Sequence, residues 1–158
     1  MKIVSKLKNL LAICGITSLL CTSTMAFAHE GDCPFCKLKL VQNTKDQDNE
    51  VVVKFGNKRI EYRCVTCVFK DQKRYKSDLI VYAPSEKVGE PVVLKRKEGV
   101  WSAPEGTVFI NSFKKHADCS MLSRAFSSKD ALDVYIKKND IKDAKPLTLE
   151  EFAAAVAK

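Results

Sequence analysis

Residues 50–67, EVVVKFGNKRIEYRCVTC, contain the pattern that decides the fold. Two runs that mix apolar and charged residues, 50–55 and 58–63, flank the dipeptide Gly56-Asn57, whose residues tolerate positive φ. This arrangement predicts a tight β-hairpin. The residues that follow, 64–75, begin with a Cys-Val-Thr-Cys motif and predict a turn that opens a short helix.

Further strands are predicted on both sides of this hairpin. Upstream, Lys37-Leu-Lys-Leu40 alternates charged and apolar residues, which is typical of a half-buried strand. Downstream, a second hairpin turns around Glu98-Gly99, after an apolar strand and a loop with proline and glycine. The predicted strands outside the first hairpin are 37–42, 78–83, 92–97, 100–101 and 107–111.

Two helices are predicted near the C-terminus. Ser127 or Ser128 is suited to cap a helix over 130–138, whose apolar residues recur on one face. Thr148-x-x-Glu151 forms a capping box for a last helix over 149–157.

The order of these elements, antiparallel hairpins with short helices, indicates an α+β fold. It also suggests two ββα-like units, at 33–78 and 79–140. Both would belong to a single exported domain, 29–158, that ends in the helix over 149–157.

Residues 1–28 have the features of a cleaved secretory signal peptide. A basic start precedes an apolar run, 10–20, that is too short to span a bilayer. Ala26-Phe-Ala28 supplies a cleavage site, which predicts cleavage after Ala28 and export to the periplasm. An uncleaved anchor and lipid attachment at Cys21 are the alternatives, but Leu20 is unlike the small residue that precedes a lipoprotein cysteine.

The chain is basic, with 27 Lys and Arg residues against 19 Asp and Glu residues. Loss of the three lysines in the signal peptide lowers the formal charge from +8 to +5. The remaining lysines are scattered and no aromatic residues alternate with them, so we expect a solvated surface and no binding of nucleic acid. A second long apolar run is absent from the sequence, so we expect no membrane span after cleavage.

Five of the seven cysteines follow the predicted signal peptide, and four of these form two C-x-x-C pairs, Cys33-Pro-Phe-Cys36 and Cys64-Val-Thr-Cys67. Each pair places two sulfurs on one tight turn, and the hairpin between them can bring the turns together around Cu⁺ or Zn²⁺. Two structural disulfides fit the spacing equally well in an oxidising compartment. Thiol–disulfide exchange at the first pair fits less well, because no predicted strand leads into it.

A second set of soft ligands lies in His116-Ala-Asp-Cys119-Ser-Met121. It offers an imidazole, a thiol and a thioether, the donors that Cu⁺ favours. Cys119 and Met121 could instead be ordinary core residues. His29 would be the first residue of the mature chain, where its amine and imidazole could chelate Cu²⁺, although a terminus without a role is the simpler interpretation.

No arrangement of catalytic residues is apparent in the sequence. It contains no Gly-x-Ser-x-Gly motif, no phosphate-binding loop and no His-Glu-x-x-His motif. Cys119 with His116 could suggest a nucleophile and a base, but nothing in the sequence orients the base. We therefore expect a binding protein and not an enzyme.

The order of these motifs resembles the NosL family, exported copper-binding accessory proteins associated with nitrous oxide reductase. The likeness lies in the turn 33–38, in Ile60-Glu-Tyr-Arg-Cys-Val-Thr-Cys67, in 107–111 with Met121, and in Ala125-Phe-Ser-Ser128 before 130–135. The resemblance implies a pair of ββα-like units that hold Cu⁺ and pass it on without catalysis.

This chain departs from the family pattern at its sulfur ligands. The family typically has C-x-x-C-G-M, whereas Lys37-Leu38 follows the first pair here and removes one thioether candidate. Cys67 and Cys119 are additional sulfurs relative to that pattern. A copper enzyme other than nitrous oxide reductase, or copper tolerance, fits this chain as well.

The sequence therefore predicts a Cu⁺ chaperone or sequestration protein whose partner is a copper-accepting periplasmic protein such as a reductase. The candidate ligands, not all around one ion, are Cys33, Cys36, Cys64, Cys67, His116, Cys119 and Met121. The main alternative is an exported domain whose C-x-x-C pairs form structural disulfides or a structural Zn²⁺ site. A thiol–disulfide oxidoreductase is the third interpretation.

Overall fold

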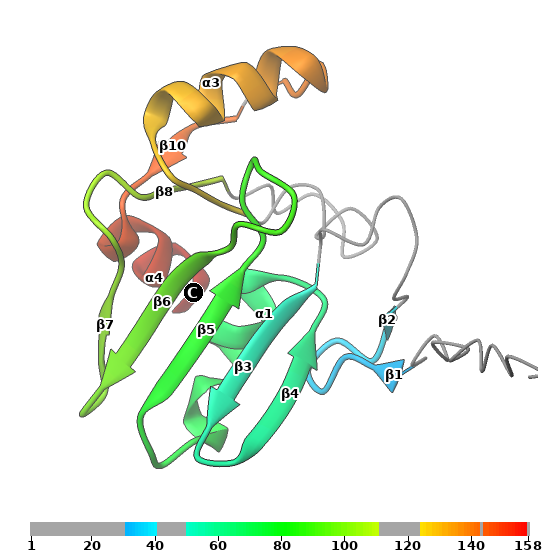
Figure 1. The fold of residues 1–158 in the computed structure, drawn as a ribbon, viewed down its shortest axis with the longest axis vertical. Coiled ribbons are helices and arrows are strands. Elements are labelled where there is room, and N and C mark those ends of the chain that lie inside the picture. The colour runs from blue at the N-terminus through cyan, green and yellow to red at the C-terminus, as the bar shows by residue number, and fades with distance from the viewer. Residues whose placement is uncertain (1–30, 41–49, 111–123, 143, 158) are drawn as a thin grey trace, which may run out of the picture.

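The structure, a computed structural model, describes residues 31–40, 50–110, 124–142 and 144–157. These residues form antiparallel sheets and short helices, which confirms the predicted α+β class (Figure 1). Within these four ranges, no helix combines the length and the apolar character that crossing a membrane requires. The predicted signal peptide lies outside the described residues.

The main sheet has five antiparallel strands in the order β4-β3-β5-β6-β7. These strands are β3 (Val51–Phe55), β4 (Lys58–Tyr62), β5 (Leu79–Ala83), β6 (Val92–Lys97) and β7 (Val100–Ser102). Both predicted hairpins are confirmed, β3 with β4 and β6 with β7. In the second hairpin Glu98 and Gly99 have φ of 51° and 86°, the positive values that a two-residue type I′ turn requires.

One face of this sheet forms the core. On β3, Val51 and Val53 are buried while Lys54 is exposed, because successive side chains along a strand point to opposite faces. Two helices, α1 (Val65–Lys70) and α4 (Leu149–Ala157), contribute their buried residues to the same core. In Figure 1 both helices lie on the far side of the sheet.

An aromatic cluster joins these helices to the sheet. Phe69 of α1 stacks on Trp101 of β7 with ring centroids 4.2 Å apart, and it meets Phe152 of α4 edge-on at 5.1 Å. Phe152 in turn stacks on Phe109 of β8 (Val108–Ile110) at 4.7 Å. The aromatic cluster therefore fixes α1, which carries part of the second C-x-x-C motif, against the sheet.

A second sheet has three strands in the order β10-β8-β9. Its other two strands are β9 (Ala125–Phe126) and β10 (Pro146–Leu147). The helix α3 (Lys129–Lys138) packs on this sheet through Leu132, which is buried with Ile110 and Phe126.

Helix caps occur where the sequence predicts them. The Ser128 hydroxyl accepts a hydrogen bond from the Ala131 N–H at 3.2 Å and caps α3, so Ser128 rather than Ser127 is the capping residue. At α4, the Thr148 hydroxyl accepts the Glu151 N–H at 3.2 Å, and the Glu151 carboxylate accepts the Thr148 N–H at 2.8 Å. This reciprocal pair is the predicted capping box.

The structure differs from the prediction at the first predicted strand, 37–42. Among its described residues only β2 (Lys39–Leu40) is a strand, and it pairs with β1 (Gly31–Asp32), which the sequence pattern did not predict. Lys37 has φ of 62°, a left-handed value that belongs to a turn and not to a strand. A two-residue strand is too short to show periodicity, which is also why β9 and β10 were not predicted.

Strands from both of the ββα-like units suggested at 33–78 and 79–140 lie in the main sheet, whereas β8 and β9 of the second belong to the three-stranded sheet. β5 pairs with β3 across the suggested boundary, with Val53 opposite Val81. A short 3₁₀ helix, η2 (Gln72–Arg74), follows α1 before the chain enters β5.

Candidate metal centre

The first C-x-x-C pair lies on a tight turn closed by β1 and β2. The Cys33 N–H donates to the Leu38 carbonyl and the Lys37 N–H donates to the Cys33 carbonyl, both at 2.9 Å. The Lys37 ammonium also donates to the Pro34 carbonyl at 2.8 Å. These bonds place Cys33 and Cys36 on one turn, as the spacing predicted.

The second C-x-x-C pair lies at the start of α1. Cys64 is the N-cap residue, with extended backbone, and its carbonyl accepts the N–H groups of Cys67 at 3.1 Å and Val68 at 3.4 Å. Residues three apart lie on the same side of a helical turn. Accordingly, the Cys64 thiol donates to the Cys67 sulfur at 3.4 Å.

Arg63 holds the two motifs together. Its N–H donates to the Cys33 sulfur at 3.5 Å, and its guanidinium donates through Nη1 to the Lys39 carbonyl at 2.8 Å. Because Arg63 immediately precedes Cys64, these bonds seat the turn of the first pair beside the start of α1. Sequence reasoning did not single out Arg63, since one of these contacts comes from its backbone, which leaves no residue-specific pattern.

A second group that sequence reasoning missed anchors α1 from its other end. The Tyr62 hydroxyl donates to the Asp71 carboxylate at 2.7 Å and shares a hydrogen bond with the Tyr75 hydroxyl. Asp71 also pairs with Arg74 at 2.7 Å. Burial raises the pKa of Tyr62 and of Tyr75, so both remain neutral hydrogen-bonding groups. The inward position of Tyr62 in the strand alternation was the available signal for this network.

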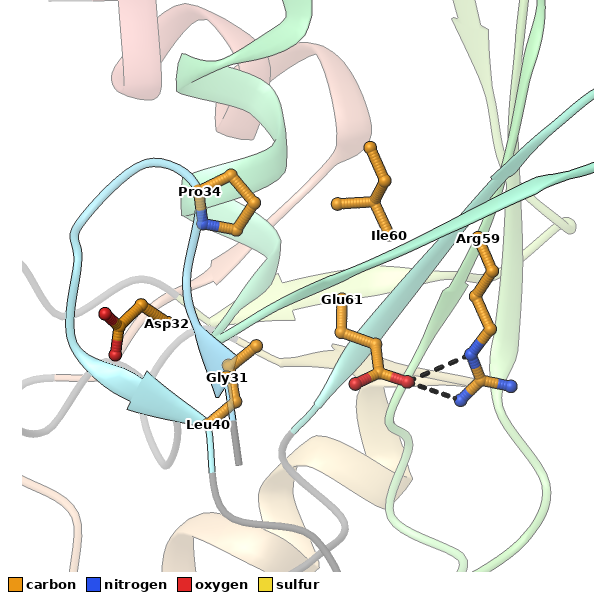
Figure 2. Close-up of a pocket in the computed structure, with 7 residues that line it drawn as sticks. All are labelled: Gly31, Asp32, Pro34, Leu40, Arg59, Ile60 and Glu61. Carbon is orange, nitrogen blue, oxygen red and sulfur yellow. Dashed lines mark hydrogen bonds and ion pairs between the residues drawn. The ribbon is translucent and has the colours of Figure 1, made fainter. Parts of the chain in front are cut away.

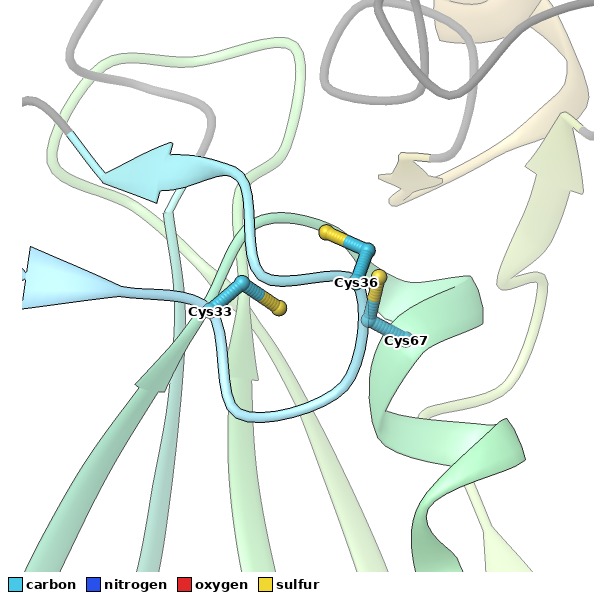
Figure 3. Close-up of side chains that lie close together, drawn as sticks. All are labelled: Cys33, Cys36 and Cys67. Atoms are coloured by element: carbon cyan, nitrogen blue, oxygen red, sulfur yellow. The ribbon is translucent and has the colours of Figure 1, made fainter.

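Three cysteine sulfurs converge from the two motifs. The Sγ atoms of Cys33, Cys36 and Cys67 all lie within 4.8 Å of one another (Figure 3). Sulfur ligands lie about 2.3 Å from Zn²⁺, so three sulfurs spread evenly around such an ion are about 4 Å apart. The cluster therefore fits a thiophilic ion after small side-chain adjustments, and we call it the three-thiol cluster.

The three-thiol cluster is buried on one side and open on the other. Cys33 and Cys67 are 0% exposed, whereas Cys36 is half-buried. A hydrogen bond from the Cys67 thiol, helped by the Arg63 N–H, lowers the pKa of Cys33 to about 5 against the opposing effect of burial. Burial raises the pKa of Cys36. The surroundings of Cys33 thus favour its thiolate form, whereas those of Cys36 favour its neutral thiol form.

The other predicted ligands have different outcomes. Cys64 touches Cys67 but is not part of the three-thiol cluster. All four described cysteines are thiols, with no disulfide among them. His116, Cys119 and Met121, as well as His29, lie outside the described residues.

A cavity of about 530 Å³ lies beside the turn of the first pair, between the β1–β2 ribbon and β4 (Figure 2). It is lined by Gly31, Asp32, Pro34, Leu40, Arg59, Ile60 and Glu61. In this lining, Arg59 and Glu61 form an ion pair, in which the Arg59 Nη2 atom lies 2.8 Å from the Glu61 carboxylate. No sulfur belongs to this described lining, so the cavity is separate from the three-thiol cluster.

No family model matches the chain, and neither the curated proteins nor the solved structures give a match. The geometry of the sulfur atoms is therefore the basis for assigning a metal-binding role to the described residues. A group of three cysteines that could hold a metal ion is what the structure establishes.

Proposed function

We propose that this protein binds Cu⁺ outside the cytoplasm and passes the ion to a copper-accepting periplasmic protein such as a reductase. The observation that carries the proposal is the convergence of Cys33, Cys36 and Cys67, whose sulfurs lie within 4.8 Å of one another. Soft thiolate ligands select Cu⁺ over hard cations such as Mg²⁺ and Ca²⁺. The protein would hold and release the ion without catalysing a reaction.

The exposure of the cluster supports transfer as well as storage. Two of its sulfurs, those of Cys33 and Cys67, are fully buried, whereas the half-buried Cys36 lies at the opening of the cluster. A recipient can then replace ligands one at a time, beginning at Cys36, before the ion leaves the buried pair. Phe35 and Leu38, each 36% exposed, provide apolar contact area beside that opening.

The NosL resemblance and the signal-peptide features of residues 1–28 support the same proposal from the sequence. A copper-accessory protein needs export to meet a copper enzyme outside the cytoplasm. The wider candidate set, which includes His116, Cys119 and Met121, would then offer ligands for a second step of capture or release.

A structural Zn²⁺ site is the second candidate. It is favoured by Cys64, whose sulfur lies 3.4 Å from Cys67 and could become a fourth ligand if the cluster rearranges. Structural zinc sites are almost always closed by four ligands. The number of thiols that an ion protects therefore separates the two candidates.

Anaerobic titration of the purified, reduced protein tests the proposal. The first equivalent of Cu⁺, supplied from a colorimetric Cu⁺ chelator, should protect Cys33, Cys36 and Cys67 from an alkylating reagent, as peptide mass spectrometry can map. A Zn²⁺ titration is the parallel control. Protection of all four C-x-x-C cysteines by Zn²⁺, with no uptake of Cu⁺, would favour the structural site and remove the chaperone proposal.

The affinity for Cu⁺ should fall on acidification, because protons compete with the ion for the thiolates. The raised pKa of Cys36 means that this thiol loses a proton when the ion binds at neutral pH. The pKa of Cys33 is about 5, so Cys33 joins the competition only below that value. Below about pH 5, the slope of log Kd against pH should become steeper by about one, which corresponds to one additional proton competing with the ion. C33S should remove this change of slope. A line of constant slope through this range in the unmodified protein would contradict the assignment of Cys33.

A further inference from the structure

The sulfur of Cys64 has a position that metal binding by three thiols does not explain. It contacts the Cys67 sulfur at 3.4 Å but lies outside the three-thiol cluster. We propose that Cys36, Cys67 and Cys64 form a disulfide relay, in which a small-molecule disulfide reacts at Cys36 and the oxidation ends in a buried Cys64–Cys67 disulfide. The relay needs no metal, so it goes beyond the proposed function and can be tested without it.

Exposure determines where an oxidant can enter. Among the four described cysteines, Cys33 and Cys67 are 0% exposed and Cys64 is 1% exposed, whereas Cys36 is half-buried. Thiol–disulfide exchange requires direct contact between the attacking sulfur and the disulfide. Cys36 is therefore the entry point, even though partial burial raises the pKa of its thiol.

The chemistry consists of three exchanges. The Cys36 thiolate attacks the small disulfide RSSR, forming a Cys36–SR mixed disulfide and releasing one RS⁻. Cys67, whose sulfur lies within 4.8 Å, gives up its proton and attacks the Cys36 sulfur, forming a Cys36–Cys67 disulfide and releasing the second RS⁻, which takes up a proton. The Cys64 thiolate attacks the Cys67 sulfur and releases Cys36 as a thiolate. Two protein thiols lose two electrons and two protons in total, and RSSR becomes two RSH.

Geometry favours Cys64–Cys67 as the end point. A disulfide needs its sulfurs about 2.05 Å apart and its Cβ atoms about 3.5–4.5 Å apart. Cys64 at the N-cap and Cys67 three residues later share one helical turn, and their sulfurs are already 3.4 Å apart. Because the product disulfide is buried, a reductant can reduce it only by exchange through Cys36.

The relay would control the metal centre. A Cys64–Cys67 disulfide removes Cys67 from the three-thiol cluster and leaves only two ligands, Cys33 and Cys36. Conversely, an ion held by the cluster occupies Cys36 and Cys67 and blocks the exchanges. This consequence rests on the proposed function, whereas the relay itself does not.

Incubation of metal-free protein with oxidised glutathione, in a C119S background, tests the relay. Peptide mapping by mass spectrometry should find a Cys64–Cys67 disulfide as the final product. C36S should slow its formation at least about tenfold, because the exposed entry thiol is lost. C64S should stop the reaction at a Cys36–Cys67 disulfide, while C33S should still reach the Cys64–Cys67 end point.

These variants separate the relay from the metal site and from misfolding. Serine is a favoured N-cap residue, so C64S should fold, and circular dichroism verifies this. C33S removes a proposed metal ligand but no relay thiol, whereas C64S does the reverse, so the two proposals can fail independently. A Cys33–Cys36 disulfide as the only product in the unmodified protein, or unchanged rates in C36S, would overturn the relay.

Discussion

Replacing Cys67 with serine should weaken Cu⁺ binding by at least about 100-fold. Loss of an outer-shell partner alone costs about 10- to 100-fold in metal affinity, and Cys67 would be a direct ligand. The hydroxyl of serine is a hard donor that binds Cu⁺ poorly. Competition with a Cu⁺ chelator under anaerobic conditions measures the change. Serine is close to cysteine in size, and its buried hydroxyl can keep the hydrogen bond that the Cys67 sulfur accepts from the Cys64 thiol, so the fold should tolerate the exchange.

The matched control is C64S, in the same motif and the same helical turn. Cys64 lies outside the three-thiol cluster, so its replacement should change the affinity for Cu⁺ only a few-fold. Equal, large losses in both variants would instead indicate a four-thiolate centre, as in the structural zinc candidate. No loss in C67S would show that the three-thiol cluster is not the site.

The hairpin at 50–63 could be predicted because its information is local. Gly56 supplies the positive φ of 52° that the turn needs, and the side chains of the strands alternate on either side of it. The helix caps at Ser128 and Thr148 are local in the same way, since each joins residues three apart. Lys37 misled the prediction because a left-handed lysine has no sequence signature, and its alternation with Leu38 resembles a strand.

The candidate site could be predicted only in part. The spacing of the two C-x-x-C pairs correctly indicated that their sulfurs meet, but it treated Cys64 and Cys67 as equivalent ligands. They differ because Cys64 is the extended N-cap residue and Cys67 lies inside the first helical turn, so their side chains leave the backbone in different directions. Which of the two sulfurs meets Cys33 and Cys36 depends on how Arg63 seats the turn of the first pair against α1, a long-range contact with no sequence pattern.

The position of Cys67 depends in turn on packing far from the sulfurs. α1 has only six residues, which is too short for a stable isolated helix. Phe69, two residues after Cys67, is held between Trp101 and Phe152. The aromatic cluster is therefore what holds a short, marginal helix in place as a support for a metal ligand. Its loss should first of all lower the free energy of unfolding.

Replacing Phe152 with alanine should lower the free energy of unfolding by about 3–5 kcal/mol, the range for removing a fully buried aromatic ring. Phe152 is 0% exposed and contacts Phe69 and Phe109, so α4 loses its hold on both α1 and β8. Urea unfolding of the metal-free protein measures the change. V134A on α3 is the control, since Val134 is 67% exposed and its truncation should cost less than about 0.5 kcal/mol.

The same variant tests whether packing and metal binding are linked. An ion that binds only the folded state stabilises it, so a saturating amount of Cu⁺ should move the urea midpoint of F152A back towards that of the metal-free unmodified protein. C67S added to F152A should abolish most of this recovery, because the cluster then lacks one of its three sulfurs. A cost below about 1 kcal/mol for F152A would mean that α4 is not what holds α1 in place, and the support proposed for Cys67 would have to come from Arg63 and the Tyr62 network alone.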